Sequence, residues 1–246
     1  MSGGARTVLV TGAAGAIGGA VVRRLHGEGV GVIGTDRGAA PLGLPVVQWI
    51  AADLATAAGR AAIGDLGATK LDGFVHCAGV FHTGRLADIT EADWDHVFAV
   101  HAKGPLLLFQ RVADRMAPGS AAVFVASIAA LRGTPDHLLY AASKAALRSL
   151  AAGLALGLAE RRIRVNCLCP GLIDTPMTDA ANAALAQARG VAIDVVAAER
   201  AAAIPTRRAG PSEEVAGAVS FLLSRDAAYM TGTTLTLAGG LLAGAV

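Results

Sequence analysis

The chain has 246 residues, of which 54% are hydrophobic and 16% charged, a composition that excludes an intrinsically disordered protein. Its length is enough to bury a substantial core. The formal net charge is +2 and the basic residues are scattered, so a nucleic-acid partner is not expected.

Short apolar segments alternate with helix-length amphipathic segments along the chain. Between the first two apolar segments, for example, Ile17, Val21 and Leu25 recur at helical spacing. The predicted strands, in chain order, are 7–11, 30–35, 46–51, 73–77, 121–126, 164–169 and 234–237. Such alternation predicts an α/β fold, a doubly wound parallel sheet of the Rossmann type with helices on both faces.

We find no internal repeat, linker or shift in composition, so we expect a single domain over residues 1–246. The least regular stretch is 174–208, which is rich in alanine and contains Pro176 and Pro205. Ligands of doubly wound sheets bind beyond the carboxyl ends of the strands. This stretch follows the sixth strand, so we predict that it forms a lid over the substrate.

A glycine-rich turn joins the first strand to the first predicted helix, in the sequence TGAAGAIG at 11–18. Such a turn lets backbone N–H groups and the positive end of the helix face a pyrophosphate. Glycine also occurs at such turns for steric reasons alone. The candidate cofactor contacts here are Gly12, Ala14, Gly15, Ala16, Ile17 and Gly18.

Asp36 follows the second strand, where a carboxylate can accept hydrogen bonds from an adenosine ribose. Its charge would repel the 2′-phosphate of NADP. Arg37 complicates this interpretation, because its guanidinium could receive that phosphate or lie against the adenine ring. We favour NAD as the cofactor, and the alternative is that Asp36 is merely a turn residue.

Tyr140 and Lys144 are spaced to lie one turn apart on one face of a helix. A phenol titrates near pH 10, and an adjacent ammonium is expected to lower that pKa. The pair could therefore act as a general acid and base, although a solvated helix pair is the simpler alternative. Ser127 ends the strand at 121–126, so its hydroxyl lies at the edge where ligands bind.

These residues together resemble the short-chain dehydrogenase/reductase (SDR) family, in its NAD-dependent form, over nearly the whole chain. The motifs that carry the resemblance are the turn at 11–18, Asp53-Leu54, His76-Cys77-Ala78-Gly79, Ser127, Tyr140 with Lys144, Pro170-Gly171 with Ile173 and Thr175, and Thr231-Gly232 with Gly239-Gly240. The resemblance implies that Asp53 and Leu54 lie on the adenine side. It also implies nicotinamide contacts from residues 170–175.

The resemblance further implies the roles of the catalytic residues. Tyr140 transfers a proton to or from the substrate oxygen, and Lys144 lowers the pKa of that tyrosine and holds the nicotinamide ribose. Ser127 donates a hydrogen bond to the substrate oxygen, and the cofactor carries the hydride. His137, just before Tyr140, is a further candidate substrate contact.

Four residues depart from the family pattern: Ala16 replaces a glycine, Cys77 an asparagine, Ala238 an aspartate and His101 an asparagine. The last matters most, because the family's asparagine is thought to support a water chain from the lysine to solvent. Pro105, four residues on, has no N–H to donate to the carbonyl of His101. We hypothesise that this carbonyl keeps the relay. The alternative is a packing histidine in an impaired enzyme.

We therefore expect an NAD(H)-dependent oxidoreductase that interconverts a small or medium secondary alcohol and a ketone. The lid offers no obvious charged anchor apart from Arg207 and Arg208 at its far end, which favours an alicyclic, steroid-like or dihydrodiol substrate. One alternative is an NADP-dependent 3-oxoacyl reductase. Another is a non-catalytic NAD-binding sensor, because of His101.

No secretory signal and no stretch of roughly 20 apolar residues is visible, so we expect a cytoplasmic protein without a membrane partner. Cys167 and Cys169 lack the neighbouring Cys or His that a zinc site needs, and we expect no metal. The segments 94–116 and 141–161 are rich in Ala and Leu. By resemblance to the family, they are expected to pair in a homotetramer or dimer.

Overall fold

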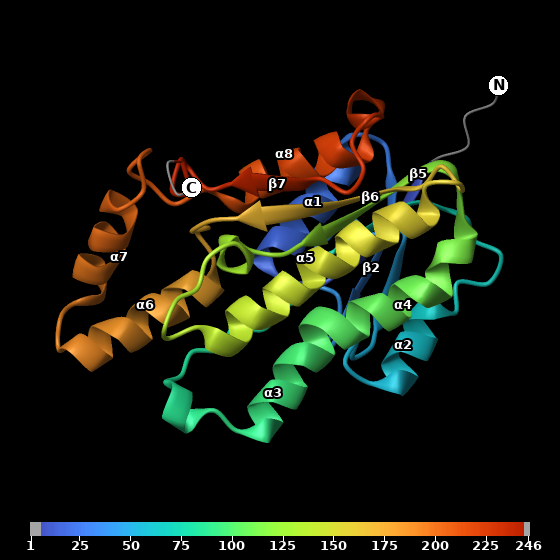
Figure 1. Ribbon diagram of the computed structural model, residues 1–246. Coiled ribbons are helices and arrows are strands. Elements are labelled where there is room, and N and C mark those ends of the chain that lie inside the picture. Colours follow the sequence, from blue (N-terminus) through green and yellow to red (C-terminus); the bar gives the residue numbers. More distant parts are fainter. Residues whose placement is uncertain (1–5, 244–246) are drawn as a thin grey trace.

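The computed structural model describes residues 6–243, so both ends of the predicted 1–246 domain lie outside the described part. Seven parallel strands form one sheet in the order β3-β2-β1-β4-β5-β6-β7 (Figure 1). The strands are β1 (Thr7–Thr11), β2 (Gly31–Asp36), β3 (Gln48–Ala51), β4 (Leu71–His76), β5 (Met116–Val125), β6 (Arg164–Pro170) and β7 (Thr234–Leu237). The predicted doubly wound parallel sheet is confirmed. Its strand order reverses between β1 and β4, the point at which such sheets bind ligands.

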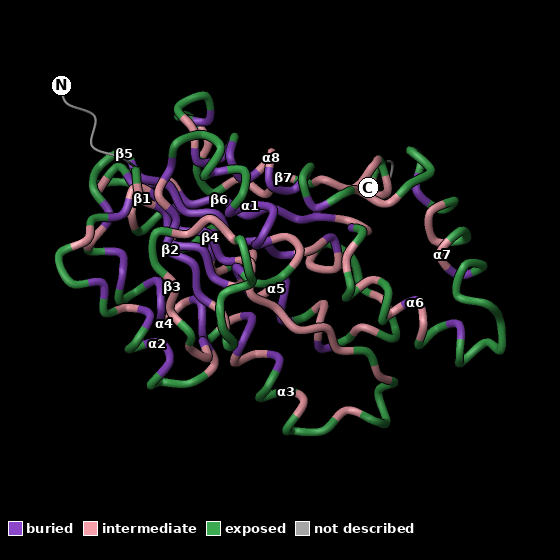
Figure 2. The backbone as a smooth tube through the Cα atoms, turned by 180° about the vertical axis from the view of Figure 1, so that it is seen from behind, coloured by how far each residue is buried: buried purple, intermediate pink, exposed green. Residues whose placement is uncertain are grey.

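Helices cover both faces of this sheet. On one face α1 (Ala16–Gly27) and α8 (Ser212–Leu223) pack over a core of valines such as Val8 and Val123. On the other face lie α2 (Ala57–Gly64), α4 (Gly104–Val112) and α5 (Leu138–Leu158). Phe74, Phe109 and Phe124 form the centre of this second core, with ring centroids 5.1–5.6 Å apart. Figure 2 shows the buried chain concentrated along the central strands.

Most strand boundaries differ from the predicted ones by one or two residues. The largest difference is at β5, which begins at Met116 rather than at residue 121. Only Met116 pairs with β4 at its start, opposite Leu71, and the register then shifts before Ala121 pairs with Gly73. The residues between them are largely exposed, so they carry no apolar pattern from which a strand could be predicted.

The segment 94–116, which is expected to pair with a second chain, is not one continuous helix. It consists of α3 (Glu91–Phe98), a π-helical turn at Ala99–Lys103, α4 and a 3₁₀ turn at Ala113–Arg115. In the π turn the N–H of Gly104 donates to the carbonyl of Ala99, five residues back. A Cβ at Gly104 would lie only 2.6 Å from that carbonyl oxygen, so the glycine permits the turn. π turns of this kind occur frequently at functional sites.

The predicted lid stretch contains two helices, α6 (Pro176–Arg189) and α7 (Ile193–Ala202). Figure 1 shows both helices beyond the arrowhead of β6, at the carboxyl edge of the sheet. Thr175 caps α6, because its hydroxyl accepts the N–H of Thr178. None of the helices within residues 6–243 combines the length and apolar character needed to cross a membrane.

Candidate active site

The glycine turn between β1 and α1 fits tightly against the neighbouring chain. Gly12 has a positive φ of 68°, and a Cβ there would lie 2.4 Å from the nitrogen of Ala78. A Cβ at Gly18 would lie 2.0 Å from the carbonyl oxygen of Gly12. Gly15 is the N-cap of α1, and the first turn of this helix contains no acidic residue. The backbone cradle and the positive helix end therefore suit a pyrophosphate.

A cavity of about 350 Å³ opens beside this turn, at the carboxyl ends of β1, β2 and β4. It brings together the predicted residues Gly12, Ala14, Gly15, Ala16, Ile17, Gly18, Asp36, Arg37, Asp53, Leu54, Cys77, Ala78, Gly79 and Thr175. Sequence reasoning missed Val80, His96, Val100 and Met177, which also line it. Val80 lies in the loop after β4, and the other three reach the cavity from α3, the π turn and α6, so none belongs to a motif. The set fits a dinucleotide.

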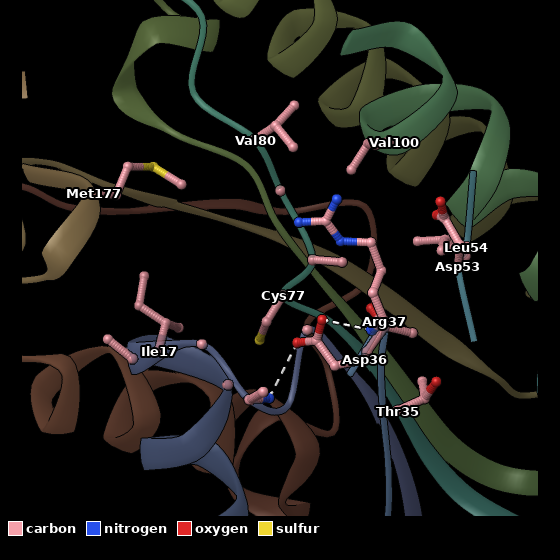
Figure 3. Close-up of a pocket in the computed structure, with 18 of the residues that line it drawn as sticks. Ile17, Thr35, Asp36, Arg37, Asp53, Leu54, Cys77, Val80, Val100 and Met177 are labelled. Carbon is pink, nitrogen blue, oxygen red and sulfur yellow. Dashed lines mark hydrogen bonds between the residues drawn. The ribbon is translucent and has the colours of Figure 1, made fainter. Parts of the chain in front are cut away.

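Asp36 is held at the end of β2 by two backbone donors. Its Oδ2 accepts the N–H of Ala14 at 3.2 Å, and its Oδ1 accepts the N–H of Arg37 at 2.8 Å (Figure 3). The carboxylate is therefore fixed between β2 and the glycine turn. Figure 3 shows the Arg37 side chain extending into the cavity. Within residues 6–243, no salt bridge includes Arg37.

Ser127, Tyr140 and Lys144 meet at the carboxyl end of β5. Ser127 comes just after this strand, while Tyr140 and Lys144 lie in the first turns of α5. The Lys144 ammonium donates to the carbonyl oxygen of Val125 at 3.2 Å and lies 5.8 Å from the centre of the Tyr140 ring. Ser127 lies close enough to Tyr140 for its hydroxyl to lower the pKa of the phenol by hydrogen bonding. The predicted spacing thus produces a cluster of phenol, hydroxyl and ammonium.

The pKa of Tyr140 differs from the expectation. It is raised above its ordinary value by burial, which outweighs the lowering effect of the Ser127 hydrogen bond. Burial also lowers the pKa of Lys144 to about 8. The Lys144 ammonium is hydrogen-bonded to the carbonyl of Val125 and lies over the tyrosine ring. It is not among the groups that lower the pKa of the phenol. Tyr140 is therefore a neutral phenol at neutral pH, a form that can donate a proton.

His101 is completely buried in the π turn and fully hydrogen-bonded. Its Nε2 accepts the N–H of Val80 at 3.0 Å, so the proton of the neutral ring must be on Nδ1. Nδ1 then donates to the Ser143 hydroxyl at 2.8 Å, and Ser143 donates to the carbonyl of Tyr140 at 2.8 Å. Burial, with a smaller effect of Lys144, holds the pKa of His101 well below its ordinary value. The ring thus links the cofactor-side loop to α5.

A second cavity, of about 300 Å³, adjoins the first and shares Ile17, Thr175 and Met177 with it. The predicted residues that line this cavity are Ser127, His137, Tyr140, Pro170, Gly171, Ile173 and Thr175. Lid residues from α6 and α7 line it as well, including Met177, Ala181 and Arg200. The candidate nicotinamide contacts at 170–175 therefore lie beside the phenol. His137 is half-buried, and burial lowers its pKa.

The expectation that the lid has only Arg207 and Arg208 as charged anchors is wrong. Arg208 pairs with Glu214 at 2.6 Å, and Arg207 donates to the carbonyl of Ala202 at 2.6 Å. Instead, Arg200 of α7 and Arg132 line the second cavity. Sequence spacing could not reveal this, because the side of α7 that faces the cavity depends on how α6 and α7 pack.

Cys167 and Cys169 lie on the same face of β6, with their sulfurs 4.0 Å apart, and both are buried. Across residues 6–243, no group of three or more His, Cys, Asp or Glu side chains could hold a metal ion.

Comparison with known proteins adds to this geometry. A family model described as enoyl-(acyl carrier protein) reductase matches residues 12–242. The chain belongs to the short-chain dehydrogenase/reductase family. Like other members of this family it is an oxidoreductase, and its fold is one that binds a nicotinamide cofactor.

Several SDR relatives match over most of the chain. Nodulation protein G of Rhizobium sp. (strain N33) is 36% identical over 248 residues, covering 96% of each chain. The 3-oxoacyl-[acyl-carrier-protein] reductase FabG of Thermotoga maritima is 36% identical over 174 residues, which cover 70% of this chain and 66% of that protein.

Two solved SDR-like structures illustrate the similarity of fold. A short chain dehydrogenase family protein from Francisella tularensis subsp. tularensis SCHU S4 has a TM-score of 0.92 and 28% identity, covering 98% of this chain and all of that one. A blue fluorescent protein from a metagenomic library, solved in complex with NADPH, has a TM-score of 0.84 and 30% identity. It covers 97% of this chain and 98% of that one.

Proposed function

We propose that the chain is an NAD(H)-dependent oxidoreductase that interconverts a secondary alcohol and a ketone of small or medium size, with an alicyclic or dihydrodiol-like frame. The observation that carries this proposal is the meeting of Ser127, Tyr140 and Lys144 at the carboxyl end of β5, where Ser127 and Tyr140 line the cavity that adjoins the one suited to the cofactor. One cavity suits the cofactor, and the other is large enough for a ring-sized substrate.

The chain's own groups would supply the proton chemistry. Bound nicotinamide supplies or accepts the hydride. In the reducing direction the neutral Tyr140 phenol donates its proton to the substrate oxygen. The Ser127 oxygen accepts the N–H of Ala129 at 3.1 Å, and its O–H would turn from Tyr140 to donate to the same substrate oxygen. Lys144 would hold the nicotinamide ribose.

The preference for NAD depends on Asp36. An Asp36→Ala variant should lose the repulsion of a 2′-phosphate and expose Arg37 to it, so the ratio of kcat/KM for NAD over NADP should fall by roughly tenfold or more. Steady-state kinetics with both cofactors measure this ratio. Asp88→Ala is the control, because Asp88 is exposed and lines neither cavity. A wild-type preference for NADP would contradict the proposal.

That last result would favour an NADP-dependent 3-oxoacyl reductase, an alternative that the unpaired Arg37 and the similarity to FabG support. A non-catalytic NAD-binding sensor is a third candidate, suggested by His101. Tyr140 and Lys144 lie close together at the start of α5, which supports an enzyme over a sensor. Tight NAD binding without oxidation across a broad alcohol panel would favour it.

We keep the proposal that the proton relay from Lys144 runs through the backbone carbonyl of residue 101, whatever its side chain. Asparagine is shorter than histidine and would not span from Val80 to Ser143. His101→Asn is therefore expected to lower kcat by less than about tenfold, through disturbed positioning. A rise of kcat by orders of magnitude would show instead that the histidine impairs the relay.

Assembly into a dimer or tetramer remains a prediction. Trp94 on α3 and Leu156 on α5 are large apolar side chains left exposed on the two segments expected to pair. A mass from light scattering equal to that of one chain would contradict the expected assembly.

A further inference from the structure

We infer that the second cavity binds the anionic group of its substrate, a carboxylate or a phosphate, through Arg200 with help from Arg132. This inference rests on the proposed function of the same cavity, and it names the chemical class of the substrate. It adds an acid group to the alicyclic, steroid-like or dihydrodiol substrate that the sequence favours.

The charge of the cavity wall is the first observation. Arg132 and Arg200 both line the cavity, and none of its lining residues is Asp or Glu. Asp136, which is exposed and lies beside His137, does not line the cavity. His137 itself is neutral at neutral pH, because burial lowers its pKa. Two cations therefore face this space without a carboxylate.

Arg200 differs from Arg189 and Arg208 of the lid region. Arg189 pairs with Glu199 at 2.6 Å, and Arg208 pairs with Glu214 at 2.6 Å. Arg200 follows Glu199 directly in the chain, yet its Nη1 donates only to the neutral amide oxygen of Asn182. Its Nη2 and Nε make no hydrogen bond within residues 6–243, so donors remain for a ligand.

Burial makes this arrangement costly without an anion. Arg200 is half-buried, and burial lowers its pKa. Removing a cation from water without a counter-charge is unfavourable. A guanidinium binds a carboxylate or a phosphate with two parallel hydrogen bonds, and these charge-assisted bonds are among the strongest in proteins. An anionic substrate would supply the missing partner.

A buried hydroxyl supports the same conclusion. The Oγ1 of Thr134 is buried and has no hydrogen-bond partner within the described chain, and Thr134 lines the cavity with the two arginines. Unpartnered buried hydroxyls are uncommon and point to a ligand or water. The apolar wall includes Phe81, Ile128 and Ile173. The wall therefore suits a hydroxylated ring that also carries an acid group.

Binding of unreactive cyclohexane derivatives tests this inference separately from catalysis. Cyclohexanecarboxylate, cyclohexyl phosphate and neutral cyclohexanecarboxamide are titrated into the NAD-loaded protein by calorimetry. At least one anion should bind about tenfold or more tightly than the carboxamide, because only an anion can pair with the guanidinium. Comparing the two anions identifies which acid group the cavity prefers.

Variants connect this preference to Arg200. Arg200→Met should abolish the anion preference while leaving carboxamide binding within about twofold, since Met keeps the apolar stem. Arg208→Met should preserve the preference, because Arg208 is paired with Glu214 outside the cavity lining. Equal wild-type binding of all three probes would overturn the inference, as would an anion preference that survives in an Arg132→Met/Arg200→Met double variant.

The proposed function is tested by a separate measurement, the oxidation of an alcohol. Oxidation of cyclohexanol by the wild type, with loss in Tyr140→Phe, would support the oxidoreductase even if the probes showed no anion preference. Conversely, strong anion binding without oxidation of cyclohexanol or of 3-hydroxycyclohexanecarboxylate would support the anion site and contradict the proposed function.

Discussion

Tyr140→Phe is expected to lower kcat by about 10³-fold, because the variant has no proton to exchange with the substrate oxygen. The ring itself packs edge-on against Phe81 and His101, with centroids 5.2 and 5.6 Å away, and phenylalanine keeps these contacts. Folding should therefore be preserved. Appearance of NADH absorbance with cyclohexanol and cyclohexane-1,2-diol measures the loss.

The chain's other tyrosine provides a matched control. Tyr229 is fully exposed, so Tyr229→Phe should leave kcat unchanged. NAD binding should persist in Tyr140→Phe, since Tyr140 does not line the cofactor cavity. Turnover by Tyr140→Phe within about threefold of wild type would remove the basis of the proposed mechanism.

Lys144→Met is expected to stop turnover and yet to stabilise the cofactor-free protein. The pKa of Lys144 falls from 10.5 to about 8 on folding. The unfolded chain therefore holds more protons between these values, and stability rises with pH through that window. Below pH 8 the full cost of the buried charge is present. Removing it should raise the free energy of unfolding at pH 7 by about 2 kcal/mol, after allowing for the lost bond to Val125.

Urea denaturation of the cofactor-free protein at pH 7, 8, 9 and 10 measures this effect. The difference between variant and wild type should shrink as the pH rises through 8 towards 10.5, because above 10.5 the lysine is mostly neutral in both states. Lys103→Met is the control, because Lys103 is exposed. A Lys144→Met protein less stable than wild type at pH 7 would show that the ammonium stabilises the fold.

Local patterns were sufficient to predict much of this structure. The sheet and its helices follow from alternation of apolar residues, and the turn at 11–18 follows from glycines whose Cβ atoms would collide with backbone. Tyr140 and Lys144 meet because helix geometry alone determines their spacing.

Other features depend on contacts between distant residues, which spacing does not encode. The rise in the pKa of Tyr140 depends on burial beneath several elements. The π turn forms because Gly104 can approach the carbonyl of Ala99 closely. The 3.6-residue periodicity of a helical sequence does not show where a turn contains one additional residue. Arg200 reaches the cavity because α7 folds back beside α6, whereas Arg208, eight positions later, forms a salt bridge with Glu214.

The imidazole of His101 donates a hydrogen bond to Ser143 and accepts one from Val80, so both of its ring nitrogens are occupied. Such a ring has no free lone pair with which to act as a base, and burial holds its pKa well below the ordinary value of histidine. Any inflection in the rate profile between pH 6 and 8 must therefore be assigned to another group. The His101 imidazole therefore fixes the distance between the loop at Val80 and α5, and we do not expect it to make the rate depend on pH.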